Sequence, residues 1–438
     1  MTKMTETNSV KHKVAKNAGW IIVSKAFQAL LALAINMLTA RFLGPSNYGL
    51  INYAVSIVTF VVPIMNLGFS NVLVQELTNH PDEEGVIVGT SISLSLISSV
   101  FCILGVLTYT FFVDLGETIT HIVVGLYSLT LACQAFELIQ YWYQAKLLSK
   151  YTAIVSLIAY VIVSSYKVVL LVTRANVAYF AVSNSIDYFL IALSLVIIYR
   201  KLGGQKFSFS SSVGKRMFSK SKHYIVASLM VAIFAQTDKI MLKLMIDETA
   251  VGYYSAAVTC AGMTGFVFSA IIDSFRPVIF SHKKNGDNSS YELSLERLYS
   301  VIIYLSLLQC ILMTVLSKYI VYILYGTDYS ESVFALQIVV WYTTFAYLGA
   351  VRNIWILSEN KQKYLWILNL GGASLNILLN LLFIPYWGIY GAALASLITQ
   401  VFTNVIMNVI VWPIRHNNYL MLKGLNPKLI FELLKKQD

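Results

Sequence analysis

The residues of this sequence best suited to chemistry are ionisable side chains inside long apolar stretches. In FAQTDKIMLKLMI (234–246), Asp238 and Lys239 stand side by side in a segment otherwise apolar enough to be buried. A charge at the centre of a bilayer costs roughly 2.5–3.5 kcal/mol on insertion scales, so such residues point to pairing, binding or proton transfer. Nine residues follow this pattern: Lys25, Glu137, Lys167, Asp187, Asp238, Lys239, Asp273, Arg276 and Arg352.

The composition identifies the solvent around these charges. Of 438 residues, 57% are hydrophobic and 12% are charged, and the mean hydropathy is +0.69. A soluble chain carries about 25% charged residues, so this composition indicates a multi-pass membrane protein. The four cysteines and six histidines show no disulfide or metal-ligand spacing, so neither a metal site nor another cofactor is expected.

The elements that must position the charges are helices of about 20 apolar residues, which span about 30 Å. The sequence predicts an all-α integral membrane protein with about 12 transmembrane helices in two six-helix lobes. The predicted domains are residues 1–200, a basic linker at 201–222, residues 223–414 and a tail at 415–438. The apolar windows are 18–40, 48–75, 86–113, 119–143, 152–173, 177–199, 223–245, 250–278, 296–323, 333–357, 364–384 and 388–412.

The distribution of Lys and Arg between the windows predicts the orientation. With the N-terminus in the cytoplasm, 23 of these residues fall in cytoplasmic segments and 4 in external ones. Basic loops stay on the cytoplasmic side, so both termini are expected there. The same rule explains the basic segment 200–222 without a nucleic-acid partner. One cytoplasmic segment, TNHPDEEG (78–85), is acidic instead.

An internal repeat supports the two lobes. YGLINYAVSIV (48–58) aligns with VGYYSAAVTCA (251–261) at an offset of 203, and each stretch opens an even-numbered helix. Small-residue patterns are frequent in membrane helices, so the alignment alone is weak. Together with six windows on either side of the basic segment, it favours a parallel repeat with a central cleft.

Depth in the membrane separates the nine charges into two classes. Lys25 and Asp187 lie about eight and ten residues into their helices, and Asp238 and Lys239 point about 100° apart, so these residues and Glu137 are expected to line a polar cavity or to form buried pairs between helices. Lys167 and Arg352 lie near helix ends, where a long side chain can reach the interface. Asp273 and Arg276 are three residues apart and are expected to pair, with a substrate role as the alternative.

Several sequence motifs of known enzymes are absent, which limits the classes of function further. The sequence contains no GxxxxGK[ST], HExxH, CxxC or GxSxG motif, and no large external loop. The residues therefore predict a secondary transporter and not an enzyme, without naming its substrate.

Several stretches resemble the polysaccharide transporter family, which includes the O-antigen flippases of the Wzx type and belongs to the multidrug/oligosaccharidyl-lipid/polysaccharide exporter superfamily. The similarity is carried by ARFLGPSNYGLINYA (40–54), QTDKIMLKLMIDETAVGYYSAA (236–257) and IPYWGIYGAALASLITQ (384–400). It implies a V-shaped exporter that alternates between inward-open and outward-open states. The acidic 78–85 segment departs from the basic loop expected of this family.

The resemblance implies a polyprenyl-diphosphate oligosaccharide as substrate, moved across the bacterial inner membrane for O-antigen, lipopolysaccharide or similar surface polysaccharide. A polysaccharide polymerase and a chain-length regulator are possible partners. On this interpretation the substrate is bound by Lys25, Lys239 and Arg276. Coupling or gating is assigned to Asp187, Asp238 and Glu137. The driving force would be protons, sodium or the membrane potential.

Three alternatives remain open at the level of sequence. A multidrug and toxin extruder would have a carboxylate in the first helix, where residues 18–40 contain Lys25 and no acid. A major-facilitator sugar transporter would have a glycine- and arginine-rich loop after the second helix, where TNHPDEEG stands. A membrane polysaccharide polymerase would need a long external loop, which the windows do not leave room for.

Overall fold

The computed structural model describes residues 2–429, with side chains for residue 28 and residues 31–429. The described chain contains helices and no strands, and it divides into two compact units, Met1–Ala232 and Ile233–Asp438. The boundary falls inside one long helix, α9 (Ser211–Met245). The all-α fold class predicted from the sequence is confirmed, whereas the predicted domain limits stay a prediction.

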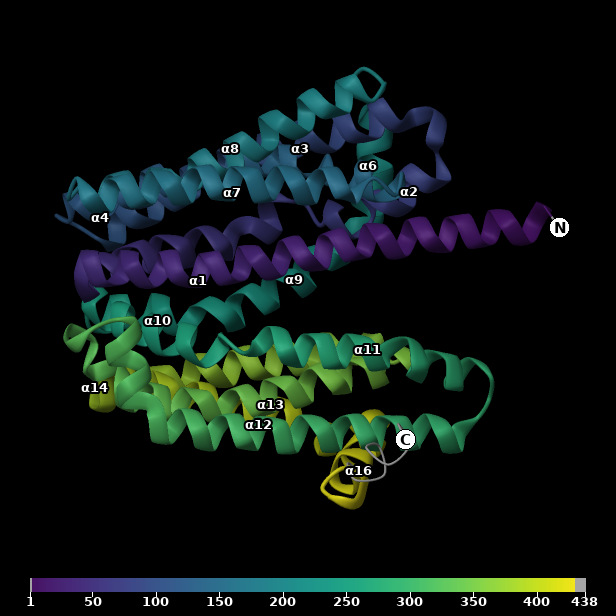
Figure 1. The fold of residues 1–438 in the computed structure, drawn as a ribbon. Helices are drawn as coiled ribbons and strands as arrows, with labels where there is room; N and C mark the ends of the chain where they lie inside the picture. The colour runs from purple at the N-terminus through teal and green to yellow at the C-terminus, as the bar shows by residue number, and fades with distance from the viewer. Residues whose placement is uncertain (1, 430–438) are drawn as a thin grey trace. The chain divides into compact units, whose positions relative to one another are not determined.

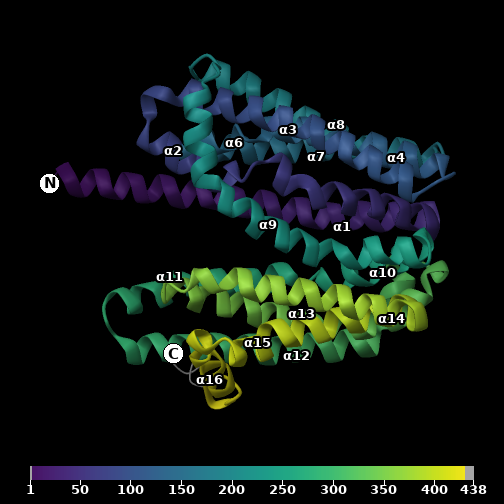
Figure 2. The ribbon, with the colours of Figure 1, turned by 180° about the vertical axis from the view of Figure 1, so that it is seen from behind.

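Unit 1 is built from long helices joined by short connections (Figure 1). Within it α7 packs against α8, and α3 runs along the same group (Figure 2). Before α9 its elements are α1 (Thr2–Met65), η1 (Phe69–Asn71), α2 (Leu73–Asn79), η2 (Pro81–Glu83), α3 (Glu84–Val113), α4 (Thr118–Ser128), α5 (Thr130–Glu137), α6 (Gln140–Ala145), α7 (Ser149–Val172) and α8 (Val177–Lys201).

Unit 2 starts within α9 and centres on α13, which packs against α10, α12 and α14. Its buried core includes Tyr299 of α12 and Trp355 of α13. After α9 its elements are α10 (Glu248–Gly262), α11 (Gly265–Lys284), α12 (Asn288–Leu324), η3 (Thr327–Tyr329), α13 (Glu331–Ser358), η4 (Gln362–Tyr364), α14 (Leu365–Val401), η5 (Phe402–Ile406, one π-helical turn), α15 (Met407–Ile410), η6 (Trp412–Ile414) and α16 (His416–Lys423).

The described helices agree with a multi-pass membrane protein. Nine are long and apolar enough to span a bilayer, and a tenth arises if α10 and α11, bent by 43° at their junction, form one span. Each of the helices α1 and α14 extends over one predicted apolar window and part of the next. The two parts are separated by a non-helical glycine, Gly44 (φ 72°) in α1 and Gly388 (φ 56°) in α14. Glycine accepts these positive φ values without a side-chain clash, so the chain turns back there (Figure 1).

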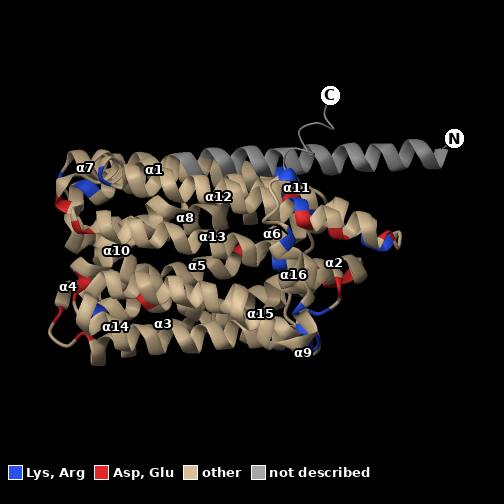
Figure 3. Cartoon of the chain, turned by 90° about the horizontal axis from the view of Figure 1, so that it is seen from below, with Lys and Arg blue, Asp and Glu red and all other residues tan. Residues whose placement is uncertain are grey.

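The side chains follow the same logic as the helix lengths. Large apolar residues remain exposed on the spans, including Phe101 and Phe112 of α3 and Val315 and Ile323 of α12. Lys, Arg, Asp and Glu gather mainly at helix ends (Figure 3). Apolar flanks and polar ends are the arrangement that a lipid environment requires.

The basic segment 201–222 is only partly a linker, which corrects the predicted helix start at 223. Residues 205–210 lie along α3, where Gly85 N donates to Gln205 Oε1 (2.9 Å) and Ser210 N donates to Thr90 Oγ1 (3.0 Å). A Cβ at Gly89 would lie 2.5 Å from the Ser208 carbonyl oxygen, so glycine permits this close approach. The helix α9 then begins at Ser211, before the apolar window, because its basic first turns have acidic partners.

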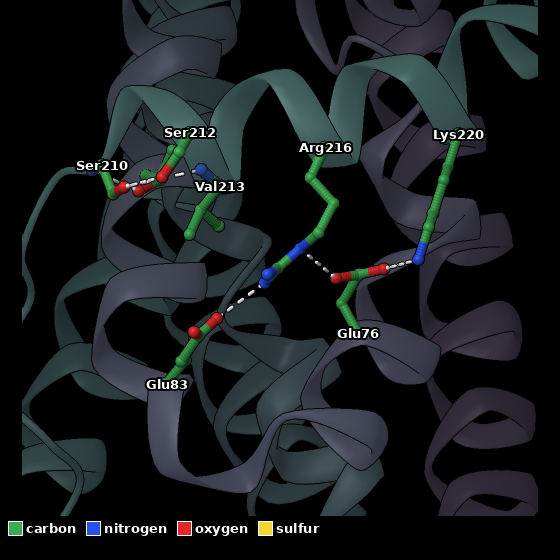
Figure 4. A network of polar contacts seen from close by, with 8 residues as sticks. Glu76, Glu83, Ser210, Ser212, Val213, Arg216 and Lys220 are labelled. Atoms are coloured by element: carbon green, nitrogen blue, oxygen red, sulfur yellow. Dashed lines mark hydrogen bonds and ion pairs between the residues drawn. The ribbon is translucent and has the colours of Figure 1, made fainter.

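Those partners lie in and next to the acidic segment that had seemed out of place. Arg216 Nε lies 3.1 Å from Glu76 Oε2 and Arg216 Nη2 lies 2.7 Å from Glu83 Oε2 (Figure 4). Lys220 pairs with the other oxygen of Glu76, whose side chain is only 1% exposed. The acidic and basic segments of unit 1 therefore neutralise each other, a contact between residues more than 130 positions apart.

The described part of the predicted tail at 415–438 contains the helix α16. The helix α16 packs on α12, and Tyr299 Oη donates to Asn417 Oδ1 at 2.7 Å. Lys423 Nζ lies 3.0 Å from Glu296 Oε1. This part of the tail is therefore a structured portion of unit 2.

Candidate functional site

The most extensively bonded charge within the described spans is Asp238 on α9, in unit 2. Its Oδ1 accepts from Asn380 Nδ2 (2.7 Å) and Asn376 Nδ2 (3.0 Å), both on α14. Its Oδ2 accepts from Tyr254 Oη of α10 (2.5 Å) and from the hydroxyl of Ser396. Four donors fill the acceptor sites of one carboxylate, and the residue is 7% exposed. We call these five residues the Asp238 cluster.

The local sequence explains how the Asp238 cluster forms. Asn376 and Asn380 are four residues apart, so they share one face of α14. Ser396 lies beyond Gly388, and only the reversal at that glycine returns the chain to the same place. Two of the four donors therefore depend on helical spacing, and Ser396 depends on a single backbone conformation.

Lys239 does not take part in the Asp238 cluster, although it is the next residue. It is half-buried, and within the described residues it has no hydrogen bond or ion pair. Neighbouring side chains on a helix point about 100° apart, which explains the separation.

A second polar site lies in unit 1, in a cavity of about 300 Å³. Glu137 of α5 lines it and makes no hydrogen bond to a described residue. Asp187 of α8 lies close enough to Glu137 and to Lys167 of α7 for their charges to interact. Asp187 Oδ1 is buried without a hydrogen-bond partner. The other lining residues are Thr59, Val62, Asn66, Gln134, Leu138, Gln140, Tyr141 and Tyr188. We call this the Glu137 cavity.

The remaining charges fall elsewhere. Lys25 lies on α1, outside the residues whose side chains the structure describes. Arg276 and Asp273 form the expected ion pair, with Nη2 and Oδ1 3.1 Å apart, and both side chains are about half exposed or more. The expectation that Arg352 reaches the interface is wrong, because it is 4% exposed and bonded inside unit 2. Its neighbours on α14 and η5 cover it.

A comparison with known protein families identifies the family of this chain. Residues 14–283 match the family model described as polysaccharide biosynthesis protein, which is more than half of the chain. The chain belongs to the polysaccharide biosynthesis protein family. The resemblance seen in the sequence is therefore confirmed at family level, and the O-antigen flippase subtype stays a prediction.

One similar sequence aligns along nearly all of this chain, and two solved structures share its fold. An uncharacterized membrane protein of Methanocaldococcus jannaschii is 26% identical over an alignment of 465 positions, which covers 97% of this chain and 88% of the relative. The lipid II flippase MurJ in an inward closed conformation aligns with a TM-score of 0.73 at 14% identity, covering 94% of this chain and 92% of MurJ. An inward-facing multidrug resistance MATE transporter aligns with a TM-score of 0.68 at 14% identity, covering 90% and 95%.

Sequence reasoning missed the neutral members of the Asp238 cluster. It weighed only ionisable side chains, whereas Tyr254, Ser396, Asn376 and Asn380 supply every hydrogen bond that Asp238 accepts from the described residues. Two asparagines at i and i+4 within the apolar run LNILLNLLF were a usable signal. The ligand roles assigned to Lys239 and Arg276, and the coupling roles of Glu137, Asp187 and Asp238, stay predictions.

Proposed function

We propose that this protein is a flippase that moves a polyprenyl-diphosphate oligosaccharide from the cytoplasmic to the outer leaflet of the cytoplasmic membrane by alternating access. The observation that carries the proposal is the family match, in a chain whose described part consists of membrane-length helices with charged groups buried between them. The fold shared with a lipid II flippase supports the same class of cargo.

The physical problem posed by this substrate fits such a fold. A diphosphate diester carries two negative charges and a hydrated sugar, neither of which crosses about 30 Å of hydrocarbon unaided. A polar path between helices can hold the head group while the prenyl tail stays in lipid. In a negative-inside cell, each negative charge that moves outward is favoured by about 2.3 kcal/mol per 100 mV, so the membrane potential can help drive the step.

The buried carboxylates supply candidates for coupling. Asp238 joins α9, α10 and α14 through one carboxylate, so a proton or sodium ion arriving there would change the hydrogen bonds among three helices. Asp187 and Glu137 hold incompletely bonded oxygens, which are open to a proton. Lys25, Lys239 and Arg276 are the proposed substrate contacts. Surface polysaccharide such as O-antigen is the proposed product, with a polymerase and a chain-length regulator as possible partners.

The first test is a leaflet assay in cells that lack the gene. We expect the lipid-linked repeat unit to accumulate facing the cytoplasm, inaccessible to a glycan-modifying enzyme added to intact spheroplasts, and surface polysaccharide to disappear. Re-expression of the wild-type chain is the control. An unchanged leaflet distribution would contradict the flippase function.

The residue roles have separate tests at matched expression. Lys239→Ala is expected to lower surface polysaccharide, and a wild-type level would remove it from the substrate path. Asp187→Asn is expected to abolish the dependence of flipping on a pH gradient, and an unchanged dependence would exclude that proton role.

A multidrug extruder is the second candidate, favoured by the fold shared with MATE transporters. Under this alternative, deletion leaves the lipid-linked sugar correctly distributed and lowers the efflux of a cationic dye. A polymerase would instead shorten the glycan chains without retaining repeat units on the cytoplasmic side, which a chain-length assay on isolated membranes detects.

A further inference from the structure

Unit 2 contains a second polar site that none of the proposed roles uses. It is a cavity of about 200 Å³ lined by Phe234 of α9, by α13 residues around Arg352, and by residues of α14 and η5. Its polar lining consists of Arg352, Asn353, Asn369, Gln400, Thr403 and Asn404. We call it the Arg352 pocket. Among these lining residues there is one cation and no carboxylate.

Arg352 itself is the feature of the pocket that requires an explanation. Nη1 donates to the Thr403 carbonyl oxygen at 2.9 Å, and Nη2 donates to Asn353 Oδ1 at 3.1 Å. Nε is buried and has no hydrogen-bond partner. No Asp or Glu of the described chain lies within ion-pairing distance. A guanidinium has five N–H donors, so the described protein leaves both its charge and part of its hydrogen-bonding capacity unused.

The backbone around Arg352 is adapted to leave room for polar side chains. A Cβ at Gly349 would lie 2.2 Å from Asn404 Oδ1, and one at Gly372 would lie 2.5 Å from Thr403 Oγ1, so a larger residue at either position would displace these polar side chains. Asn404 and Thr403 belong to η5, the π-helical turn. Such turns are rare and are frequently found at functional sites.

We propose that the Arg352 pocket binds a phosphoryl group of the lipid-linked diphosphate, an inference that rests on the function proposed above. An uncompensated guanidinium matches phosphate oxygens through its fork of N–H donors. Amides of Asn353, Asn369 and Gln400 supply neutral donors for the remaining oxygens. The cavity holds a phosphoryl group but not an oligosaccharide, so it selects the part of the substrate common to every sugar sequence.

The position of the pocket along α13 suits this ligand. Arg352 lies six residues, or about 9 Å, before the end of α13 at Ser358. In the predicted orientation that end faces the cytoplasm, where the diphosphate of a newly made lipid-linked sugar lies. Arg352 would therefore meet the head group near the start of its path.

Binding to the purified full-length protein in phosphatidylcholine nanodiscs tests the proposal. The probes are farnesyl diphosphate and inorganic phosphate at constant ionic strength. Arg352→Gln is expected to weaken the binding of both probes at least tenfold. Asn369→Asp is expected to do the same by placing a negative charge in the pocket, and it keeps the test open if the arginine variant does not fold. Arg415→Gln, which removes an exposed arginine elsewhere in unit 2, is the matched control and should bind as wild type.

Two results would overturn the inference. One is binding of both probes that neither pocket variant weakens more than the Arg415→Gln control does. The other is that phosphatidylglycerol in the nanodisc prevents farnesyl diphosphate binding through Arg352, which would make the ligand a phospholipid head group. The leaflet assay reports separately on flipping. Normal flipping in an Arg352→Gln strain, with unchanged probe binding, rejects the pocket and leaves the flippase function standing.

Discussion

Buried carboxylates are hydrogen-bonded in opposite ways in the Asp238 cluster and near the Glu137 cavity. Asp238 accepts hydrogen bonds from four neutral side chains and has no cation among its hydrogen-bond partners in the described chain. Glu137 makes no hydrogen bond to a described residue, and Asp187 has a buried oxygen without one, with Lys167 as the nearby cation. Asp238 is held by a complete set of dipoles, whereas Asp187 has only the nearby charge of Lys167, and Glu137 has the like charge of Asp187 beside it.

This difference in bonding indicates whether each region contributes mainly to stability or to function. A fully satisfied network fixes the geometry of the helices that supply it, so removing its centre strands several buried donors. Carboxylates with incomplete bonding contribute less to stability and are free to exchange a proton or bind a ligand. We therefore expect substitutions in the Asp238 cluster to act on stability first, and those around the Glu137 cavity to act mainly on function.

The largest effect is expected for Asp238→Ala. Four buried donors lose their acceptor, and each stranded donor costs about 1–3 kcal/mol, so the loss of stability should reach at least about 3 kcal/mol. Thermal unfolding of the purified protein measures it. Asp238→Asn, which keeps one acceptor oxygen and the shape, should lose less. A melting temperature unchanged in Asp238→Ala would show that the Asp238 cluster does not hold these helices together.

A smaller effect is expected for the charge pair near the Glu137 cavity. Lys167→Met and Asp187→Asn should each destabilise the protein, because each leaves the opposite buried charge uncompensated. The double variant should recover about 1–2 kcal/mol of the sum in a double-mutant cycle. If the two changes in stability were strictly additive, Lys167 and Asp187 would not interact. That result would contradict the contrast between the two regions.

A pH-dependent contribution of less than about 1 kcal/mol is expected from Glu359, outside the spans. Burial alone would raise the pKa of Glu359, but hydrogen bonds from Lys283 Nζ (2.6 Å) and Tyr291 Oη (3.0 Å) outweigh it and hold the pKa below its usual value. A lowered folded-state pKa stabilises above the unfolded-state value, and this stabilisation disappears as the pH falls through the folded-state pKa. Glu359→Gln should therefore lower the melting temperature at pH 7 and have little effect in acid. An equal loss at both pH values would contradict the ion pair.

The smallest effect on stability is expected for Glu137→Gln, within about 0.5 kcal/mol of wild type, because no described hydrogen bond is lost. The same variant should reduce flipping in the leaflet assay if Glu137 takes part in coupling. Thr59→Ser, a conservative change in the lining of the Glu137 cavity, is the matched control for flipping. A destabilisation as large as that of Asp238→Ala would remove the distinction between the two regions.

Much of the fold could be predicted because membrane helices are local in sequence. Apolar windows of bilayer length identify the spans, and α1 and α14 each extend over one window and part of the next, on either side of a glycine. The start of α9 could not be predicted from apolar windows. Its first turns are polar, and they are helical next to Glu76 and Glu83, which lie more than 130 residues earlier.

The candidate site was predictable only in its charged members. A buried Asp238 follows from an acid in an apolar segment, whereas Ser396 joins it through the backbone reversal at Gly388. Arg352 was misjudged for the same reason. Its distance from the helix end allowed it to reach the interface, but the carbonyl of Thr403 on the π-helical turn bonds it inside.

The sequence by itself determined that this is an all-helical membrane protein, that charges are buried in its spans and that it resembles polysaccharide transporters. These properties depend on composition, helix length and short motifs, which are local. Only the tertiary structure decided which polar groups meet. Asp238 with its asparagines, Arg216 with Glu76, and Arg352 with Thr403 are each separated by more than 50 residues. Their meeting depends on how the helices within each unit pack, which spacing along the chain does not encode.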